Sequence, residues 1–133
     1  MLYFAYGQSL SRKQMKEICP DATPKQSATL ANYRLVFLGY SRKWHGALAS
    51  IKPSRGDRAK GGLYEISESG LRKLDAHEEY PANSERIKVN VHNEDGSLLE
   101  AFTHTRRRSD DEAKPSAEYL TVIQQAYHEW GLV

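Results

Sequence analysis

The feature that most constrains the fold is the apolar run at residues 2–6, which stops abruptly at Gly7. Apolar side chains at successive positions occupy both faces of a strand, so this run predicts a strand that is buried inside the protein. Gly7 permits the backbone angles of a sharp turn, and the polar pair Gln8 and Ser9 follows it. The chain is therefore predicted to turn inside the molecule.

A short helix is predicted directly after this turn. Ser11 and Gln14 have the spacing of a capping box, with Ser11 as the N-cap and the Gln14 side chain reaching back, and the helix should run to about Ile18, before Pro20. A strand end and a helix start lie close together here, and both leave backbone N–H groups unpaired. Such groups can hold an anionic or oxyanionic ligand, so the turn is a candidate site.

Size and composition limit the possible classes of protein. The 133 residues fit a single domain, residues 1–133, that buries about two-thirds of its unfolded surface. A net charge of +2 gives no reason to expect a nucleic-acid or membrane partner. The single Cys19 excludes an internal disulfide and indicates a reducing compartment. The first apolar run has no basic leader and is too short to cross a bilayer, so we expect a soluble cytoplasmic protein.

One basic run, Arg106 to Arg108, is followed closely by the acidic residues 110–112. We interpret it as a solvated loop, because a phosphate-binding patch would not usually be neutralised by its own neighbours. A nucleic-acid contact is the weaker alternative, which a failure to bind oligonucleotides would exclude.

The rest of the chain alternates short strand patterns with helical ones. Dense apolar or alternating runs predict further strands at residues 33–39, 46–51, 61–66, 86–91 and 98–105. A turn is predicted at 53–57, a hairpin at Asp95-Gly96, and a last helix from about 116 to 130 that Gly131 ends. The fold class is therefore α+β: a small mixed β-barrel of about six strands, or a strongly curved sheet, with about three flanking helices.

A further helix is predicted at residues 67–81, with Ser67 as its N-cap and Pro81 as its end. Leu71 and Leu74 form its apolar face, and Glu78 follows Leu74 by four residues. Residues four apart lie on the same face of a helix, so the face that docks on the core also carries a carboxylate inward.

Glu78 is the first candidate catalytic residue. Desolvation would raise the pKa of its carboxyl group, which is the tuning that a general base near neutral pH requires. Glu79 lies about 100° further round the helix and should face solvent or the rim of a site. The structural alternative is that Glu78 only closes the helix and pairs with an arginine such as Arg86, since structural ion pairs also perturb carboxylates.

Five segments, in order, resemble the γ-glutamylcyclotransferase-like (AIG2-like) family: LYFAYGQSL at 2–10, WHGALASI at 44–51, GGLYEIS at 61–67, LDAHEEYP at 74–81 and KPSAEYL at 114–120. The resemblance implies a small mixed barrel with helices packed around it, in agreement with the α+β prediction. It implies that Glu78 is the catalytic residue. It also implies a substrate-binding loop made of Tyr6, Gly7, Gln8, Ser9 and Leu10.

The chemistry implied by this resemblance needs no cofactor. The α-amine of a small γ-glutamyl amine or amino acid attacks its own γ-carbonyl, which gives 5-oxoproline and releases the amine. Glu78 would take a proton from the attacking ammonium and pass it to the leaving nitrogen. Backbone N–H groups of residues 7–10 would bind the glutamyl end of the substrate. The expected partner is this small molecule; the oligomeric state stays open.

Three positions depart from the family pattern. Gln8-Ser9 stands where the family usually has Ser-Asn, Glu79 replaces a glycine, and Ser84 stands where many bacterial relatives carry a tyrosine. Tyr80 or Tyr119 would then have to supply the substrate contact of the missing hydroxyl. These departures leave an alternative function: a binding or regulatory module that keeps the pocket and has lost catalysis.

Two other residues have open interpretations. His45 precedes a strand and could contact substrate, although a histidine in that place is more often a structural hydrogen-bonding residue. Tyr119 lies at helical spacing with Ile123 and fits either the pocket or the core. The histidines show no metal-ligand spacing, so we expect no metal.

Overall fold

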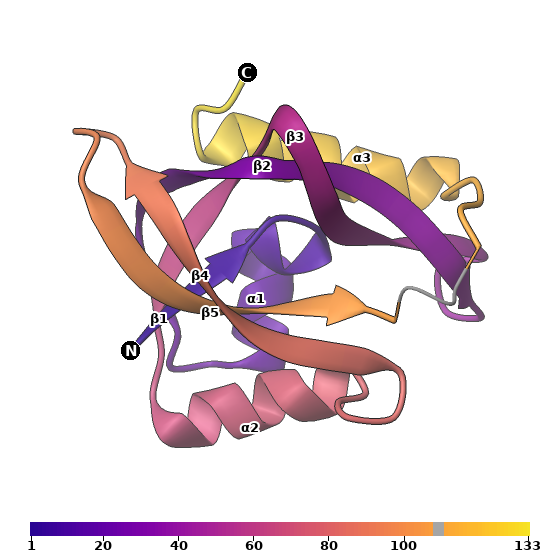
Figure 1. The fold of residues 1–133 in the computed structure, drawn as a ribbon. Coiled ribbons are helices and arrows are strands. Elements are labelled where there is room, and N and C mark those ends of the chain that lie inside the picture. Colours follow the sequence, from indigo (N-terminus) through magenta and orange to yellow (C-terminus); the bar gives the residue numbers. More distant parts are fainter. Residues whose placement is uncertain (108–110) are drawn as a thin grey trace.

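A closed β-barrel forms the centre of the molecule (Figure 1), in a computed structural model that describes residues 1–107 and 111–133. Around the barrel the described strands follow the order β1-β3-β2-β4-β5. Their bounds are β1 (Leu2–Ala5), β2 (Thr23–Ser41), β3 (Gly46–Glu65), β4 (Ser84–Asn93) and β5 (Leu98–Arg106). All neighbouring strands pair antiparallel except β1 and β5, whose parallel pairing at Tyr3 and Phe102 closes the barrel. The predicted α+β barrel is confirmed.

The barrel has one strand fewer than predicted, because the expected strands at 46–51 and 61–66 are parts of the single strand β3. The predicted turn at 53–57 is a bulge inside this strand: Ala31 pairs with Arg58, whereas Tyr33 pairs with Pro53. Gly56 has a φ of 88° there, so the turn residues act as expected but bend the strand without ending it. β2 also begins well before the predicted residue 33.

Three helices, α1 (Arg12–Ile18), α2 (Glu68–His77) and α3 (Ala117–Glu129), accompany the barrel in the described part of the chain. α2 and α3 lie on opposite sides of it (Figure 1). The side chains of Ser11, Ser67 and Ser116 each cap one helix by accepting a backbone N–H, which confirms the predicted helix starts. None of the described helices has the length and apolar character that crossing a membrane requires.

The capping box at α1 is only half formed. Ser11 Oγ accepts the backbone N–H of Gln14, as predicted. The Gln14 side chain does not return to Ser11; its Oε1 accepts a hydrogen bond of 2.9 Å from the Gln8 side chain. The helix start is therefore linked to the short 3₁₀ turn η1 (Gln8–Leu10) that precedes it.

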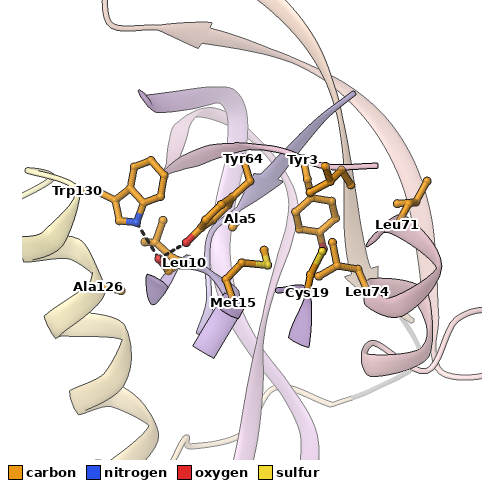
Figure 2. Close-up of a cluster of buried hydrophobic side chains, with 11 residues drawn as sticks. Tyr3, Ala5, Leu10, Met15, Cys19, Tyr64, Leu71, Leu74, Ala126 and Trp130 are labelled. Carbon is orange, nitrogen blue, oxygen red and sulfur yellow. Dashed lines mark hydrogen bonds between the residues drawn. The ribbon is translucent and has the colours of Figure 1, made fainter. Parts of the chain in front are cut away.

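A buried cluster beside the barrel anchors this turn (Figure 2). Tyr64 Oη and Trp130 Nε1 both donate to the backbone carbonyl of Leu10, at 3.1 and 2.7 Å. The Tyr64 and Trp130 rings also contact each other edge to face, with centroids 5.2 Å apart. Leu10, at the end of the first turn, is therefore held by a residue of β3 and by the residue that follows α3. Gly7, Gln8 and Ser9, at the beginning of the turn, are not held by this cluster.

Candidate active site

The two segments singled out in the sequence meet at one cavity of about 290 Å³. Gly7, Gln8 and Ser9 line it from the first turn, and Glu78 and Glu79 line it from the end of α2. Tyr6 and Tyr119 line it as well. The structure therefore brings most of the predicted site residues together.

Glu78 is the C-cap residue of α2, which ends at His77 and is thus shorter than the predicted helix. Its backbone N–H still donates to Leu74, and its partly buried side chain lines the cavity. Burial raises the pKa of this carboxyl group to about 7, even though Arg106 acts to lower it; Glu79 raises it further. Such a group can both accept and release a proton near neutral pH.

The alternative in which Glu78 pairs with Arg86 is wrong. Arg86 Nη1 lies 2.6 Å from Asp75 Oδ2 and forms its ion pair there. Asp75 precedes Glu78 by three residues, so the arginine is bound one helical turn before the glutamate. The raised pKa of Glu78 is consistent with this arrangement.

The first turn differs from the prediction at its C-terminal end. Gly7, at its start, has a φ of −116° and a ψ of −129°, outside the usual helical and extended regions, and a Cβ there would lie 2.7 Å from that of Ala49. The N–H of Leu10 donates to the carbonyl of Gly7, so only the N–H groups of Gln8 and Ser9 precede the first bond within the turn. Leu10 does not line the cavity.

Tyr119 belongs to both the cavity and the core. It is 2% exposed, and its ring contacts those of Phe37 and Trp44. Its oxygen accepts the backbone N–H of Ala49 at 2.9 Å. The two interpretations of Tyr119 are therefore compatible.

Three other residues considered in the sequence lie outside the cavity lining. Tyr80 is 37% exposed and its ring lies under the Arg86 guanidinium. His45 is exposed. Ser84 is fully buried, and its Oγ has no hydrogen-bond partner among the described residues. The structure does not bring Tyr80 to the site as a substitute for the absent tyrosine at position 84.

The sequence missed several cavity residues. Arg106 was predicted to lie in a solvated loop but ends β5 and lines the cavity. Arg107 is exposed and donates to the carbonyls of Pro81 and Ala82, and Arg108 lies outside the described residues. The other missed lining residues are Tyr3, Ser41, Lys43, Trp44, Leu48, Ala49, His77 and His104.

A chain of polar contacts runs from the cavity to α2. Tyr3 Oη lies 2.7 Å from His104 Nδ1, and His104 Nε2 lies 2.7 Å from Asp75 Oδ1. The other carboxylate oxygen of Asp75 binds Arg86. Tyr6 Oη donates to the backbone carbonyl of His104. His104 is 2% exposed, and burial lowers its pKa although Asp75 acts to raise it.

Across residues 1–107 and 111–133, no three His, Cys, Asp or Glu side chains gather as a set of metal ligands. The cavity presents carboxyl, phenol, guanidinium and backbone groups to a ligand.

Comparison with known proteins identifies the family. Residues 3–127 match the family described as "Gamma-glutamyl cyclotransferase, AIG2-like". The chain belongs to this family. Proteins named "Gamma-glutamylcyclotransferase" from Bos taurus and Homo sapiens are each 29% identical over 136 residues, which covers 98% of this chain and 72% of the relative. A solved structure titled "Gamma-glutamyl cyclotransferase" is 28% identical, with a TM-score of 0.95 over 99% of this chain and 80% of that one.

One departure from the γ-glutamylcyclotransferase pattern, Glu79 in place of glycine, lies in the left-handed region of the backbone, with a φ of 58°. The backbone N–H of Glu79 donates to the backbone carbonyl of Ala76, and the backbone N–H of Tyr80 donates to the backbone carbonyl of Asp75. These two bonds form a Schellman motif, whose left-handed position strongly favours glycine because a side chain is strained there. The Glu79 carboxylate itself is exposed and accepts a bond from Asn83.

Replacing Glu79 by glycine is expected to stabilise this γ-glutamylcyclotransferase-family protein. Removal of the left-handed strain should raise the free energy of unfolding by about 1 kcal/mol and Tm by about 3 °C. Thermal and urea unfolding measure this effect. Glu79→Gln is the matched control, because it removes the charge and keeps the strain; an equal gain in that variant would contradict the assignment to backbone strain.

Proposed function

We propose that this chain is an enzyme that cyclises the γ-glutamyl group of a small γ-glutamyl amine or amino acid, with release of 5-oxoproline and the free amine. The observation that carries this proposal is the position of Glu78: a partly buried carboxyl group, with its pKa raised to about 7, in the same cavity as the first turn. Membership of the family supports the reaction class.

In the proposed reaction Glu78 carries two protons, one after the other, from the α-nitrogen to the leaving nitrogen. Its carboxylate takes a proton from the α-ammonium, and the resulting amine attacks the γ-carbonyl carbon to close a five-membered ring. Glu78 then gives this proton to the leaving nitrogen, and the tetrahedral intermediate collapses as the bond from this carbon to that nitrogen breaks. The ring nitrogen still carries one proton too many, which it releases to the Glu78 carboxylate, and Glu78 passes this second proton to the departing amine. Because the attack is intramolecular, the enzyme mainly has to fold the glutamyl chain and position one acid–base group.

Hydrogen-bond donors for the developing oxyanion come from the first turn and from Tyr119. The N–H groups of Gln8 and Ser9 precede the first bond of the turn. Tyr119 Oη accepts the N–H of Ala49, so its own hydrogen is available to donate, and a Cβ on Gly7 would lie 3.8 Å from this oxygen. The turn and Tyr119 together suit a tetrahedral oxyanion.

The second candidate function is a binding or regulatory module without catalysis. It is favoured by Glu79, which lines the same cavity as Glu78. A second carboxylate repels the α-carboxylate of a glutamyl ligand and thus disfavours the productive pose.

A panel of γ-glutamyl amino acids and γ-glutamyl amines separates the two functions. We expect at least one of them to be converted to 5-oxoproline with a kcat on the order of 1 s⁻¹ or higher, as measured by chromatographic detection of the product. Calorimetric binding without release across the panel would favour the module. Absence of both binding and release would contradict both functions.

A further inference from the structure

Two tyrosines of the cavity direct their hydroxyl hydrogens away from it. Tyr3 and Tyr6 both line the cavity, and both form hydrogen bonds with His104. Tyr6 donates to the backbone carbonyl of His104, since a carbonyl only accepts. A phenol that donates its single hydrogen in this way can only accept bonds from a ligand.

The direction of the Tyr3 bond follows from Asp75. A carboxylate that binds Arg86 can only accept a hydrogen bond from His104 Nε2, so this nitrogen carries the ring hydrogen. Burial favours the neutral form of His104, and in that form Nδ1 carries a lone pair. Tyr3 must therefore donate to Nδ1 across the 2.7 Å contact. Asp75 thus sets the tautomer of His104, and this tautomer makes the Tyr3 hydroxyl a donor to His104 and an acceptor toward the cavity.

Tyr119 has its hydroxyl hydrogen bonds in the opposite direction. Its oxygen accepts the N–H of Ala49, which leaves its hydrogen for the cavity. Glu78 contributes to the raised pKa of all three phenols, so its carboxyl group lies within electrostatic range of each. One part of the cavity therefore offers acceptors, from Glu78 and the Tyr3 and Tyr6 oxygens, and the part at Tyr119 offers a donor.

We propose that Tyr3, Tyr6 and Glu78 form a site for the α-ammonium of the glutamyl group, with Asp75 and His104 as positioning residues that keep Tyr3 an acceptor. This inference rests on the proposed function for the identity of the ligand. An ammonium group has three donors, which matches three acceptor side chains. The phenol oxygens are uncharged, so they hold the amine both before and after Glu78 takes its proton.

The two tyrosines are not equivalent in this site. The Ser50 hydroxyl accepts the backbone N–H of Arg106, which leaves its own hydrogen to donate, and it acts to lower the pKa of the Tyr6 phenol. The Thr103 hydroxyl near Tyr3 donates to the carbonyl of Phe4 and so leaves the Tyr3 oxygen free to accept. Tyr3 is therefore the residue on which the inference is best tested.

The test compares two ligands that differ only in the ammonium group. L-Glutamate and glutarate carry no leaving amine, so binding can be measured by calorimetry without turnover. The unaltered protein is expected to bind L-glutamate about tenfold or more tightly than glutarate, and Tyr3→Phe should reduce this ratio by about tenfold, as loss of a bond to a charged donor predicts. The affinity for glutarate should stay within about twofold.

Tyr64→Phe is the matched control. Tyr64, like Tyr3, is a buried tyrosine whose hydroxyl donates a hydrogen bond, in this case to the backbone carbonyl of Leu10, but it does not line the cavity. The control should keep the unaltered ratio, and thermal unfolding verifies that both variants fold. An unaltered ratio in Tyr3→Phe, or glutarate bound as tightly as L-glutamate by the unaltered protein, would overturn the proposal, as would no L-glutamate binding up to about 10 mM.

Asp75→Asn tests the positioning role with Tyr3 still present. The asparagine oxygen should turn to Arg86, so that its NH₂ group donates to His104 Nε2 and moves the ring hydrogen to Nδ1. Tyr3 then becomes a donor to the cavity, and the ligand ratio should fall as it does in Tyr3→Phe. Retention of the full ratio in a folded Asp75→Asn variant would exclude the positioning role.

The ligand ratio and the release of 5-oxoproline are separate measurements. Discrimination without any turnover would support the ammonium site and contradict the proposed enzyme. Turnover with a ratio that Tyr3→Phe leaves unchanged would support the enzyme and contradict the ammonium site.

Discussion

Replacing Glu78 by glutamine is expected to lower kcat for 5-oxoproline release by about 10²- to 10⁴-fold, the range that removal of a general acid–base group produces. Glutamine keeps the size of the side chain and its place after α2 but cannot transfer the proton. The measurement is steady-state release of 5-oxoproline from the best member of the γ-glutamyl panel. KM should change far less than kcat, because the lost function is used in the reacting state.

Glu79→Gln is the control for this effect. Glu79 lines the same cavity, but its exposed carboxylate is bound by Asn83. We expect this variant to keep kcat or raise it, because no proton transfer is assigned to the Glu79 carboxyl group and its removal relieves the repulsion of the substrate α-carboxylate. If Glu78→Gln retained the full rate, Glu78 could not be the acid–base group, and the proposed mechanism would fail.

The same Glu78→Gln substitution is expected to stabilise the folded protein at alkaline pH. The Glu78 carboxyl group has a pKa of about 7 in the folded protein, above its ordinary value of 4.5. Between these two values the unfolded chain has already released the proton that the folded protein still holds. Stability therefore falls as the pH rises through this window, and the full loss, about 3 kcal/mol, is present above pH 7.

Glutamine does not ionise, so the variant should escape this loss. Urea unfolding at pH 4.5 and at pH 8 measures it: the gain of Glu78→Gln over the unaltered protein should be small at the lower pH and about 3 kcal/mol at the higher one. Glu79→Gln should show no comparable increase between the two. A gain for Glu78→Gln that is the same at both pH values would contradict a pKa raised by burial.

Local signals in the sequence predicted much of the fold. Ser11 and Ser67 are predicted as N-caps and Ser116 as the approximate start of the last helix, and each of the three caps its helix. The apolar alternation predicted the barrel strands, but it could not show that residues 53–57 bulge out of one continuous strand. A bulge and a turn use the same residues, and only the pairing partner β2 distinguishes them.

The sequence predicted the residues of the candidate site whose chemistry follows from their own residue type. It missed the residues whose role depends on a hydrogen-bond partner from a distant strand. Glu78 could be found because a carboxylate four residues after a buried leucine is conspicuous in a helical pattern. Tyr3 was read as part of an apolar strand, because its partner His104 is brought to it by the closure of β1 on β5. The structural alternative paired Arg86 with Glu78, whereas Arg86 binds Asp75. The two carboxylates lie three residues apart on one helix, so the sequence could not distinguish them as partners of this arginine.

The parallel junction of β1 and β5 depends strongly on side chains. Its backbone register is the single pair Tyr3 and Phe102, and further bonds run from Tyr3 and Tyr6 to His104 and from Thr103 to the carbonyl of Phe4. Several of the atoms that shape the cavity therefore also close the barrel. A substitution at this junction that reshapes the cavity should therefore also weaken the closure of the barrel, so the shape of the cavity and the stability of the fold cannot be changed independently here.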